Sequence, residues 1–369
     1  MKIVISGFYG LGNTGDEAIL ESIVDNLKDS LENPEITVFS LSPEATAKER
    51  EVKAVYRGWR HDNKGKIKAL READLLVSGG GGLLQDAYPT KFLFGPLPYY
   101  LLIVLLAKMC GTKVMFFSQG IGPVTSRWGK ILMKMANMAD FITVRDQFSK
   151  EYLENLGITK PETVVTSDIV FAFKKKHDRA CMDSLDLGPY EKLVAVSMRP
   201  WFEHTKQFEQ TAQILDELIE KRNITPVFVP MEGHHDTAAS ENVMKHMKYR
   251  DKCVMLGENF TPNQYLNFIA DCDLTIGMRL HALIFSTLSG VPHIGLSYDK
   301  KVESLLKRSG MWDFSADLME IDPDTLVANA ITLLDNHDEF STLVNANADV
   351  MRKEAVRNVD LLKEHFLNQ

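Results

Sequence analysis

A short apolar run, a turn rich in glycine or polar residues and a helix-like segment recur in this order along the chain. The first copy of this pattern joins the apolar run 2–6, the turn 7–15 and an amphipathic segment, 16–27. Such alternation is typical of parallel β-sheets covered by helices. Further strand-like runs lie at residues 36–41, 73–78, 112–117, 141–144 and 164–166, and then at 193–197, 224–230, 253–256, 274–278 and 293–296.

The length of the chain and one charged break indicate two domains. A chain of 369 residues is long for a single α/β core. The strand pattern pauses at the charge-rich segment 173–179 and resumes near Leu193, and residues from 326 onwards have a helical pattern. We therefore expect an N-terminal domain at 1–175 and a C-terminal domain at 190–369. Each should be a Rossmann-like, doubly wound α/β domain, and the two should face a common cleft.

Composition excludes several classes of protein. The formal net charge of -8 argues against a general nucleic-acid binder, which normally carries a basic footprint. The first residues lack the pattern of a signal peptide, and the longest apolar run, 97–107, has about half of the ~20 residues that span a bilayer. We expect that run to be a buried helix. Four scattered cysteines without a metal-binding spacing favour free thiols and the cytoplasm: Cys110, Cys181, Cys253 and Cys272.

The turn after the first strand contains three glycines with the spacing of a dinucleotide-binding loop: Gly10, Gly12 and Gly15. The turn is longer than in dinucleotide-binding domains, and no acidic residue ends the second strand to bind a ribose. These differences disfavour a nicotinamide or flavin enzyme. Asn13, Asp16 and Glu17 are better suited to hydrogen bonds with neutral hydroxyl groups, as in a sugar. The alternative is that Asp16 only caps a helix.

Four consecutive glycines, 79–82, follow the strand-like run 73–78 and precede Gln85 and Asp86. Glycine lets a backbone approach a ligand closely, so we expect a ligand-binding loop here. Gln85 and Asp86 could bind hydroxyl groups in that loop. Two further strand-like runs end in polar pairs, Arg145-Asp146 and Ser167-Asp168. Because parallel strands end at one edge of a sheet, these side chains should gather at the same edge.

The second half of the chain places cationic side chains after its strands. Arg279 and His281 stand between the strand-like run 274–278 and an apolar segment, and Arg199 precedes a proline at the end of another strand. An arginine fork binds carboxylate or phosphate, and a histidine exchanges protons near neutral pH. Lys300 and Lys301 follow the last strand. Together these residues favour a transferase with a small anionic donor and a sugar acceptor, although strand-end capping by Arg279 and a structural histidine remain the alternative.

Two other clusters have alternative interpretations. Six basic residues in 57–71 are either a solvated helix face or a surface for an anionic lipid or diphosphate-linked acceptor: Arg57, Arg60, Lys64, Lys66, Lys68 and Arg71. His234 and His235 lie near Glu232 and Asp236, but they lack the usual i,i+4 spacing of metal ligands. We therefore expect no metal site there.

The motifs, taken together, resemble the polysaccharide pyruvyltransferase family, and most closely its CsaB-type branch. The resemblance covers most of the chain. The motifs that carry it are Gly10-x-Gly12-Asn13-x-Gly15-Asp16-Glu17, the Gly79–Gly82 loop with Gln85-Asp86, Arg145-Asp146, Ser197-x-Arg199-Pro200, Arg279-Leu280-His281 and Tyr298-Asp299-x-Lys301.

The resemblance implies a glycosyltransferase-B-like pair of domains and phosphoenolpyruvate as the donor, so no resident cofactor is expected. It implies that a β-linked N-acetylmannosamine residue of a lipid-linked cell-wall precursor is the acceptor, in a pathway that anchors surface-layer proteins. The predicted catalytic and donor-binding residues are Arg199, Arg279 and His281, with Lys300 and Lys301 also on the donor side. The predicted acceptor-binding residues are Asn13, Asp16, Gly81 and Asp86, and Asp16 and Asp86 are candidates for the base.

Two other functions remain open at this point. A nucleotide-sugar glycosyltransferase of the same architecture would need a carboxylate for the ribose, which Glu303 could supply. A non-catalytic sugar-binding module would have little use for the Arg279 and His281 pair. A cytoplasmic location, either free or at the inner face of the plasma membrane, is expected. The oligomeric state, including a homo-oligomer, is left open.

Overall fold

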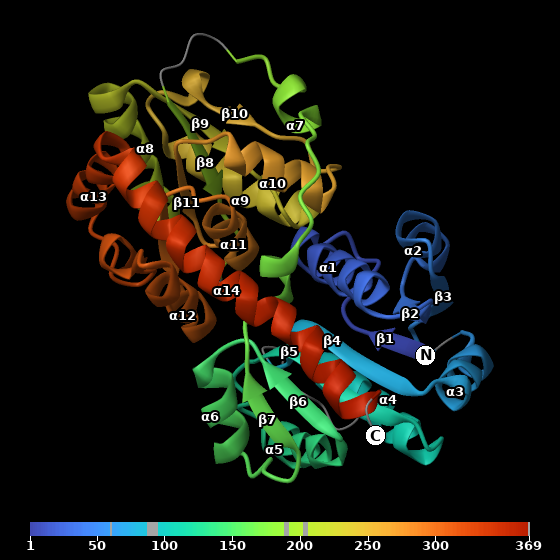
Figure 1. The fold of residues 1–369 in the computed structure, drawn as a ribbon. Coiled ribbons are helices and arrows are strands. Elements are labelled where there is room, and N and C mark those ends of the chain that lie inside the picture. Colours follow the sequence, from blue (N-terminus) through green and yellow to red (C-terminus); the bar gives the residue numbers. More distant parts are fainter. Residues whose placement is uncertain (60, 87–94, 188–191, 202–205, 368–369) are drawn as a thin grey trace. The chain divides into compact units, whose positions relative to one another are not determined.

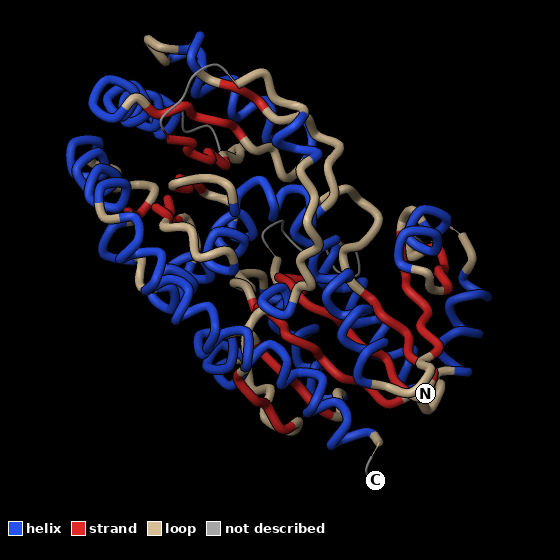
Figure 2. The backbone as a smooth tube through the Cα atoms, turned by 45° about the horizontal axis from the view of Figure 1, so that its top comes forward, coloured by secondary structure: helices blue, strands red, loops and turns tan. Residues whose placement is uncertain are grey.

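The computed structural model describes all of residues 1–369 except 60, 87–94, 188–191, 202–205 and 368–369. The chain forms two compact units. Unit 1 consists of residues 1–174 and 351–369, and unit 2 of residues 175–350. In each unit, helices surround a sheet of parallel strands (Figure 2). The predicted pair of Rossmann-like α/β folds is therefore confirmed.

Unit 1 is built on a seven-stranded parallel sheet with the order β3-β2-β1-β4-β5-β6-β7 (Figure 1). The order reverses between β1 and β4, which is the place where ligands bind in open α/β sheets. The strands are β1 (Lys2–Ser6), β2 (Glu35–Ser40), β3 (Lys53–Tyr56), β4 (Leu75–Leu84), β5 (Lys113–Ile121), β6 (Phe141–Val144) and β7 (Glu162–Val165).

The helices of unit 1 begin at residues that favour helix starts. Asn13 caps the first helix, Pro96 opens the fourth, and Asp146 caps the sixth. The predicted buried helix at 97–107 is confirmed, because Leu101, Val104 and other apolar side chains of α4 are buried. The helices are α1 (Thr14–Ser30), α2 (Pro43–Arg50), α3 (Asn63–Glu72), α4 (Pro96–Met109), α5 (Arg127–Met133) and α6 (Gln147–Asn155), with 3-10 turns η1 (Lys134–Met138) and η2 (Ile169–Ala172).

Unit 2 repeats the plan with a six-stranded parallel sheet in the order β10-β9-β8-β11-β12-β13. Its strands are β8 (Lys192–Ser197), β9 (Ile224–Phe228), β10 (Val254–Met255), β11 (Leu274–Gly277), β12 (His293–Ser297) and β13 (Ala316–Asp317). Its helices are α7 (Ala180–Asp183), α8 (Lys206–Arg222), α9 (Gly233–His246), α10 (Pro262–Ala270), α11 (Leu280–Leu288), α12 (Lys300–Ser309), α13 (Pro323–Asp335) and the first part of α14 (His337–Phe366), with η3 (Arg250–Lys252) and η4 (Trp312–Phe314).

The end of α14 belongs to unit 1, whereas we expected residues 190–369 to form one domain. Asn358 is fully buried and its side chain hydrogen-bonds Thr166 at 2.9 Å, and the His365 ring stacks on Phe141 with 3.7 Å between ring centroids. A helical pattern in the sequence does not tell which sheet the helix covers, so the packing of the end of α14 on unit 1 could not be predicted. The division near residue 175 lies where the charged break was seen.

The glycine run 79–82 lies inside strand β4 and not in a loop, which corrects the prediction of a ligand loop. Gly80 and Gly81 have φ angles of +58° and +74°, in the region that glycine adopts without strain. A Cβ atom on Gly80 would lie 2.1 Å from Cγ2 of Ile19 on α1. The glycines therefore let α1 pack closely on β4.

Two basic residues of the 57–71 segment are buried, so the interpretation as a solvated face is wrong for them. Arg57 is 8% exposed and Lys66 is 1% exposed. Arg60 lies outside the described residues.

In the part of the chain that the structure describes, no helix is long and apolar enough to cross a membrane.

Candidate active site

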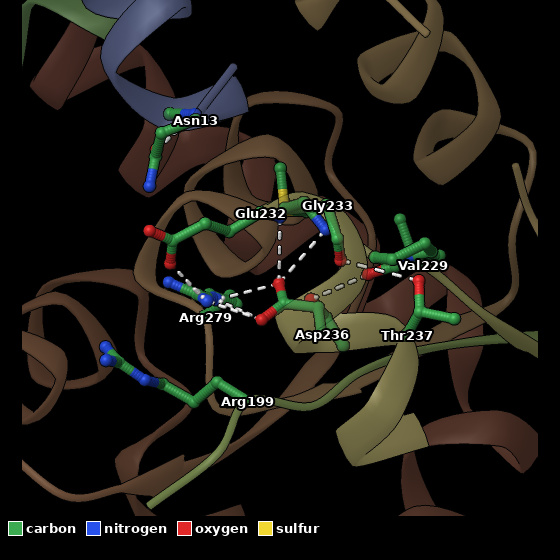
Figure 3. Close-up of polar contacts among 12 residues, drawn as sticks. Asn13, Arg199, Val229, Glu232, Gly233, Asp236, Thr237 and Arg279 are labelled. Carbon is green, nitrogen blue, oxygen red and sulfur yellow. Dashed lines mark hydrogen bonds and ion pairs between the residues drawn. The ribbon is translucent and has the colours of Figure 1, made fainter. Parts of the chain in front are cut away.

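The carboxyl ends of the unit 2 strands bring most of the predicted donor-side residues to one edge of the sheet. Arg199 follows β8, Arg279 follows β11, and Tyr298 and Lys301 follow β12. β11 pairs with both β8 and β12, so these three strand ends are neighbours. Figure 3 shows Arg199 and Arg279 extending from this edge.

Arg279 is the N-cap residue of α11, and its guanidinium is held by two carboxylates of the β9–α9 segment (Figure 3). Its Nε donates to Asp236 Oδ2 at 2.9 Å, and its Nη2 contacts Oδ1 of the same residue. Nη2 also forms an ion pair with Glu232 Oε2 at 2.5 Å. The edge of the fork formed by Nε and Nη2 is therefore occupied, and an anionic donor would meet Nη1 or displace Glu232.

Asp236, which holds the Arg279 guanidinium, is fully buried and is itself held by backbone hydrogen bonds. Its Oδ2 accepts the backbone N–H groups of Met231 at 3.1 Å and Glu232 at 3.0 Å. Burial raises the pKa of Asp236, and the ion pair with Arg279 lowers it only in part. Burial lowers the pKa of Arg279, but the two carboxylates and Tyr298 raise it overall, so Arg279 stays charged.

A second cationic group forms around Tyr298, at the end of β12. Arg199 Nη1 donates to the Tyr298 hydroxyl at 2.9 Å, and its Cζ lies 5.0 Å from the centroid of that ring. The ring packs against Trp201 at 4.4 Å, and Nζ of Lys301 lies 5.9 Å from the Tyr298 centroid. Tyr298 also raises the pKa of Arg279, so the two side chains are near each other. Arg199, Arg279 and Lys301 therefore all lie around the Tyr298 side chain.

His281 and Lys300 differ in their surroundings. His281 is the second residue of α11 and is half-buried, two positions beyond Arg279. Lys300 is exposed and pairs with Glu303 at 2.6 Å, along the surface of α12. Lys307 contacts the other oxygen of Glu303, also at 2.6 Å. Lys301 is therefore better placed than Lys300 for the donor, and Glu303 is held by two lysines.

In unit 1, Asn13 caps α1, and this replaces the alternative in which Asp16 was the cap. Asn13 Oδ1 accepts the N–H groups of Gly15 at 3.1 Å and Asp16 at 3.2 Å. Glu17 Oε1 accepts the N–H of Gly10 at 2.7 Å, and burial raises the pKa of Glu17. Asp16 is half-buried beside β4, with Oδ1 3.3 Å from the position of a Cβ on Gly81. Asn13, Asp16 and Gly81 thus lie together at the carboxyl edge of the sheet.

Both carboxylate oxygens of Asp86 accept hydrogen bonds from the backbone of unit 1. Its Oδ1 accepts the N–H of Thr125 at 2.7 Å, and its Oδ2 accepts the N–H of Ser126 at 2.9 Å. Burial raises the pKa of Asp86, but hydrogen bonds from these two residues outweigh that effect and lower it. The carboxylate holds the turn before α5, which argues against its predicted role as acceptor ligand or base.

Arg145 and Asp146 form contacts within the fold of unit 1. Arg145 Nη1 forms a buried ion pair with Asp168 Oδ2 at 2.9 Å, and Asp146 caps α6 through the N–H of Ser149. The His234 and His235 rings lie 4.2 Å apart between centroids. Among the described residues, no group of three or more His, Cys, Asp or Glu side chains could hold a metal ion.

Sequence reasoning did not assign Asp236 and Glu232 to the site, except as disfavoured metal ligands. Asp236 lies 43 residues before Arg279. It follows β9, which is not a neighbour of β11 in the sheet. The available signal was their position after a strand, which they share with Arg199 and Arg279.

Several solved structures share this fold. A putative UDP-N-acetylglucosamine 2-epimerase from Listeria monocytogenes has a TM-score of 0.70 at 14% identity, covering 100% of this chain and 97% of that chain. The Anabaena protein Alr3699/HepE, in complex with UDP and glucose, has a TM-score of 0.66 at 11% identity, covering both chains fully. At these identities the likeness shows the fold alone, which is glycosyltransferase-B-like.

Sequence comparisons are more specific. The amylovoran biosynthesis protein AmsJ of Erwinia amylovora is 21% identical over 404 residues, which cover 93% of this chain and 94% of that protein. The family model for polysaccharide pyruvyl transferase matches residues 13–300, which include Asn13, Arg199, Arg279 and Lys300. This match covers well over half of the chain and includes strands of both sheets. The protein is therefore a transferase that belongs to the polysaccharide pyruvyl transferase family.

Proposed function

We propose that the protein transfers pyruvate from phosphoenolpyruvate to a sugar as a ketal and releases phosphate. The observation that carries the proposal is the placement of Arg199 and Arg279 at the ends of the paired strands β11 and β8, within the family match. Phosphoenolpyruvate has a carboxylate and a phosphate, and arginine forks suit both groups. Lys301, beside Tyr298, adds a third positive charge to this edge.

The residues can support each proton movement of this reaction. His281 donates a proton to the methylene carbon of phosphoenolpyruvate, which makes C2 electrophilic. A sugar hydroxyl oxygen forms a bond to C2 and gives its proton to a base, for which Asp16 remains the candidate. The bond between C2 and the phosphate oxygen then breaks, and phosphate leaves with the proton that the base had taken up. A second hydroxyl bonds to C2 and closes the ketal, and its proton returns to His281.

The acceptor that we propose is a β-linked N-acetylmannosamine residue of a lipid-linked cell-wall precursor, as in the CsaB-type branch. Its support is the resemblance of the motifs and the position of Asn13, Asp16 and Gly81 at the carboxyl edge of the unit 1 sheet. The relative named for amylovoran biosynthesis supports a saccharide acceptor more broadly. Such a precursor would be modified in the cytoplasm, at the inner face of the plasma membrane.

A phosphate-release assay tests the proposal. Purified full-length protein is incubated with phosphoenolpyruvate and a diphosphate-linked disaccharide that ends in N-acetylmannosamine. We expect phosphate release and a product heavier by the pyruvylidene group, and His281→Ala should lose about 10²–10⁴-fold in turnover. Wild-type turnover in His281→Ala, or no phosphate release by the wild type, would refute the proposed mechanism or donor, respectively.

The second candidate is a nucleotide-sugar glycosyltransferase, because structures of this fold include one in complex with UDP and glucose. Its predicted ribose ligand, Glu303, accepts contacts from Lys300 and Lys307, so a ribose would compete with two ion pairs. Thermal-shift measurements separate the candidates. Stabilisation by phosphoenolpyruvate supports the pyruvyl transfer, and stabilisation by UDP-sugars alone supports the alternative.

A further inference from the structure

Arg57 stands directly after β3, at the carboxyl edge of the unit 1 sheet, and is 8% exposed. Its backbone N–H donates to the carbonyl of Ser40 at 2.9 Å, so the end of β2 fixes its position. Arginine is almost never buried to this extent without a partner for its charge. The surroundings of this side chain therefore need an explanation.

The guanidinium lies among three aromatic rings. Its Cζ is 4.8 Å from the centroid of Tyr99, 5.4 Å from that of Tyr100 and 5.4 Å from that of Phe8. Its Nη2 donates to the Tyr100 hydroxyl at 3.0 Å. We call these four residues, Phe8, Arg57, Tyr99 and Tyr100, the Arg57 box. The faces of the rings stabilise a cation, and more strongly when the cation is desolvated.

The positive charge of the Arg57 box has no counterion among the described residues. No carboxylate there forms an ion pair with Arg57, and its buried Nη1 has no hydrogen-bond partner. The buried Tyr99 hydroxyl has no hydrogen bond of good geometry among the described residues, although the Arg57 and Ser6 side chains lie close enough to lower its pKa against the effect of burial. Burying a charge costs several kcal/mol, more than the rings return. Nη1 of Arg57 and the Tyr99 hydroxyl are therefore two donors of the box that an anion can use once a ring turns aside.

Lys66 on α3 shows how a purely structural buried cation is satisfied in the same region. Its Nζ donates to the carbonyls of Tyr56 at 3.1 Å, Gly58 at 2.6 Å and His61 at 2.9 Å. These three bonds use all of its donors and hold the segment on either side of Arg57. Arg57 has no comparable set of acceptors.

The box is connected to the predicted acceptor side of unit 1. Burial raises the pKa of Tyr100, Arg57 lowers it, and Asp16 raises it, so this phenol lies within the field of both a cation and a carboxylate. β3 is two strands away from β1 in the sheet, a spacing of roughly 10 Å. A saccharide at Asp16 could therefore extend toward Arg57 along the same edge.

We propose that the Arg57 box binds a phosphate ester, namely the diphosphate that joins the acceptor saccharide to its lipid. This inference rests on the proposed function, which supplies a lipid-linked acceptor. The guanidinium fork matches phosphate oxygens, and the Tyr99 hydroxyl adds a neutral donor. Trp59 is exposed and its ring centroid lies 5.5 Å from that of Tyr99, so it offers apolar surface to the first part of the lipid, and Ile67 on α3 is a second exposed apolar side chain. Nη1 is covered by side chains, so binding requires one ring to turn aside.

Binding of inorganic diphosphate to the full-length protein tests the site directly. Calorimetric titrations are made in an Arg199→Gln background, so that the unit 2 cations do not dominate. We expect Arg57→Gln to weaken binding about 10- to 100-fold and Tyr100→Phe to weaken it less. Arg71→Gln, an exposed arginine of α3, is the matched control and should bind as before. Diphosphate binding that is unchanged in both Arg57→Gln and Tyr100→Phe would overturn the proposal.

Two acceptors separate the acceptor diphosphate from other sources of phosphate. One is a disaccharide alkyl diphosphate, and the other is the same disaccharide as an alkyl glycoside. With Arg199 intact, Arg57→Gln should raise the KM for the first acceptor about 10-fold or more and leave the second unchanged. Equal changes for both acceptors would overturn the proposal. The proposal would also be overturned if Arg57→Gln weakened only the binding of vesicles that contain an anionic phospholipid, because the ligand would then be a membrane headgroup.

The outcomes distinguish this site from the proposed function. If wild-type protein releases no phosphate from phosphoenolpyruvate but binds diphosphate through Arg57, the reaction is refuted and the phosphate-ester site stands. If pyruvyl transfer occurs and diphosphate binding does not depend on Arg57, the site is refuted and the reaction stands. If Arg57→Gln does not fold, Tyr100→Phe serves as the test variant, because the loss of one oxygen atom disturbs the fold less.

Discussion

Oδ2 of Asp236 lies 2.9 Å from Nε of Arg279 and also accepts two backbone N–H groups of the segment that follows β9. One buried carboxylate oxygen thus joins the start of α11 to the β9–α9 connection. The direction of the Arg279 side chain is set before any substrate binds. A fixed cation lowers the cost of orienting an anionic donor.

Asp236→Asn should reduce kcat/KM for phosphoenolpyruvate about 100-fold, because Arg279 loses the charge that orients it. The free energy of unfolding should fall by about 3 kcal/mol, since a buried cation loses one of its partners. Steady-state kinetics and urea denaturation measure both. Asp335→Asn, which breaks the exposed pair with Arg222, should leave both the stability and the kinetics nearly unchanged. Unchanged kcat/KM in Asp236→Asn would contradict a positioning role.

Asp86→Asn should lower stability and leave the acceptor KM unchanged. Its two oxygens accept the N–H groups of Thr125 and Ser126, and an amide nitrogen cannot replace the second acceptor. We expect a loss of about 1–3 kcal/mol, measured by chemical denaturation. A raised acceptor KM with unchanged stability would instead restore the role in acceptor binding that the sequence predicted.

Gly80→Ala should destabilise unit 1 by more than about 2 kcal/mol, since the new Cβ meets Cγ2 of Ile19 at 2.1 Å and the φ angle is +58°. Gly12→Ala is a matched control. Gly12 has a φ of +73° and nothing within 4 Å of the added Cβ, so only the backbone strain of about 1 kcal/mol applies. Thermal unfolding of both variants compares them. Equal losses would show that close packing of α1 is not the reason for glycine at position 80.

His293 on β12 should make the protein sensitive to mild acid. Complete burial lowers its pKa to about 4 from the model-peptide value of 6.5. The unfolded chain therefore takes up a proton at a higher pH than the folded chain does. The stability that neutral His293 contributes is fully present above pH 6.5 and is lost as the pH falls toward 4, by about 3 kcal/mol in total.

Denaturation at pH 7 and pH 4.5 measures this loss in the wild type, in His293→Gln and in the exposed control His246→Gln. His293→Gln should show the smaller decrease between the two pH values, whereas His246→Gln should follow the wild type. A decrease as large as that of the wild type in His293→Gln would exclude this histidine as a source of acid sensitivity.

The sequence predicted the fold well, because strand signals depend on local patterns. Central strands are buried on both faces and appear in the sequence as continuous apolar runs, such as 114–117 in β5. The edge strand β3 was missed, because its four residues are half-buried or exposed and lack such a run. The run 79–82 was assigned to a loop, because glycine is depleted in strands and the proximity of Ile19 is a tertiary feature.

The candidate site was predicted in part. Arg199, Arg279 and Lys301 were expected at one sheet edge from their positions after strands, and the structure brings them to the surroundings of Tyr298. The partners of Arg279 could not be read from the sequence, because Asp236 reaches it across a sheet from a distant segment. Likewise, no local pattern distinguishes Asp86, which holds a turn, from Asp16, which lies beside Gly81 at the carboxyl edge of the unit 1 sheet.

The return of α14 to unit 1 has a consequence for how the polypeptide matures on the ribosome. Asn358 and His365 complete the packing around Thr166 and Phe141, yet Asn358 is synthesised 192 residues after Thr166. The first part of unit 1 must therefore wait, with part of its surface uncovered, until all of unit 2 has been synthesised. A fragment that stops at residue 174 would remain in that unfinished state, and a peptide of residues 351–369 should complete it when added.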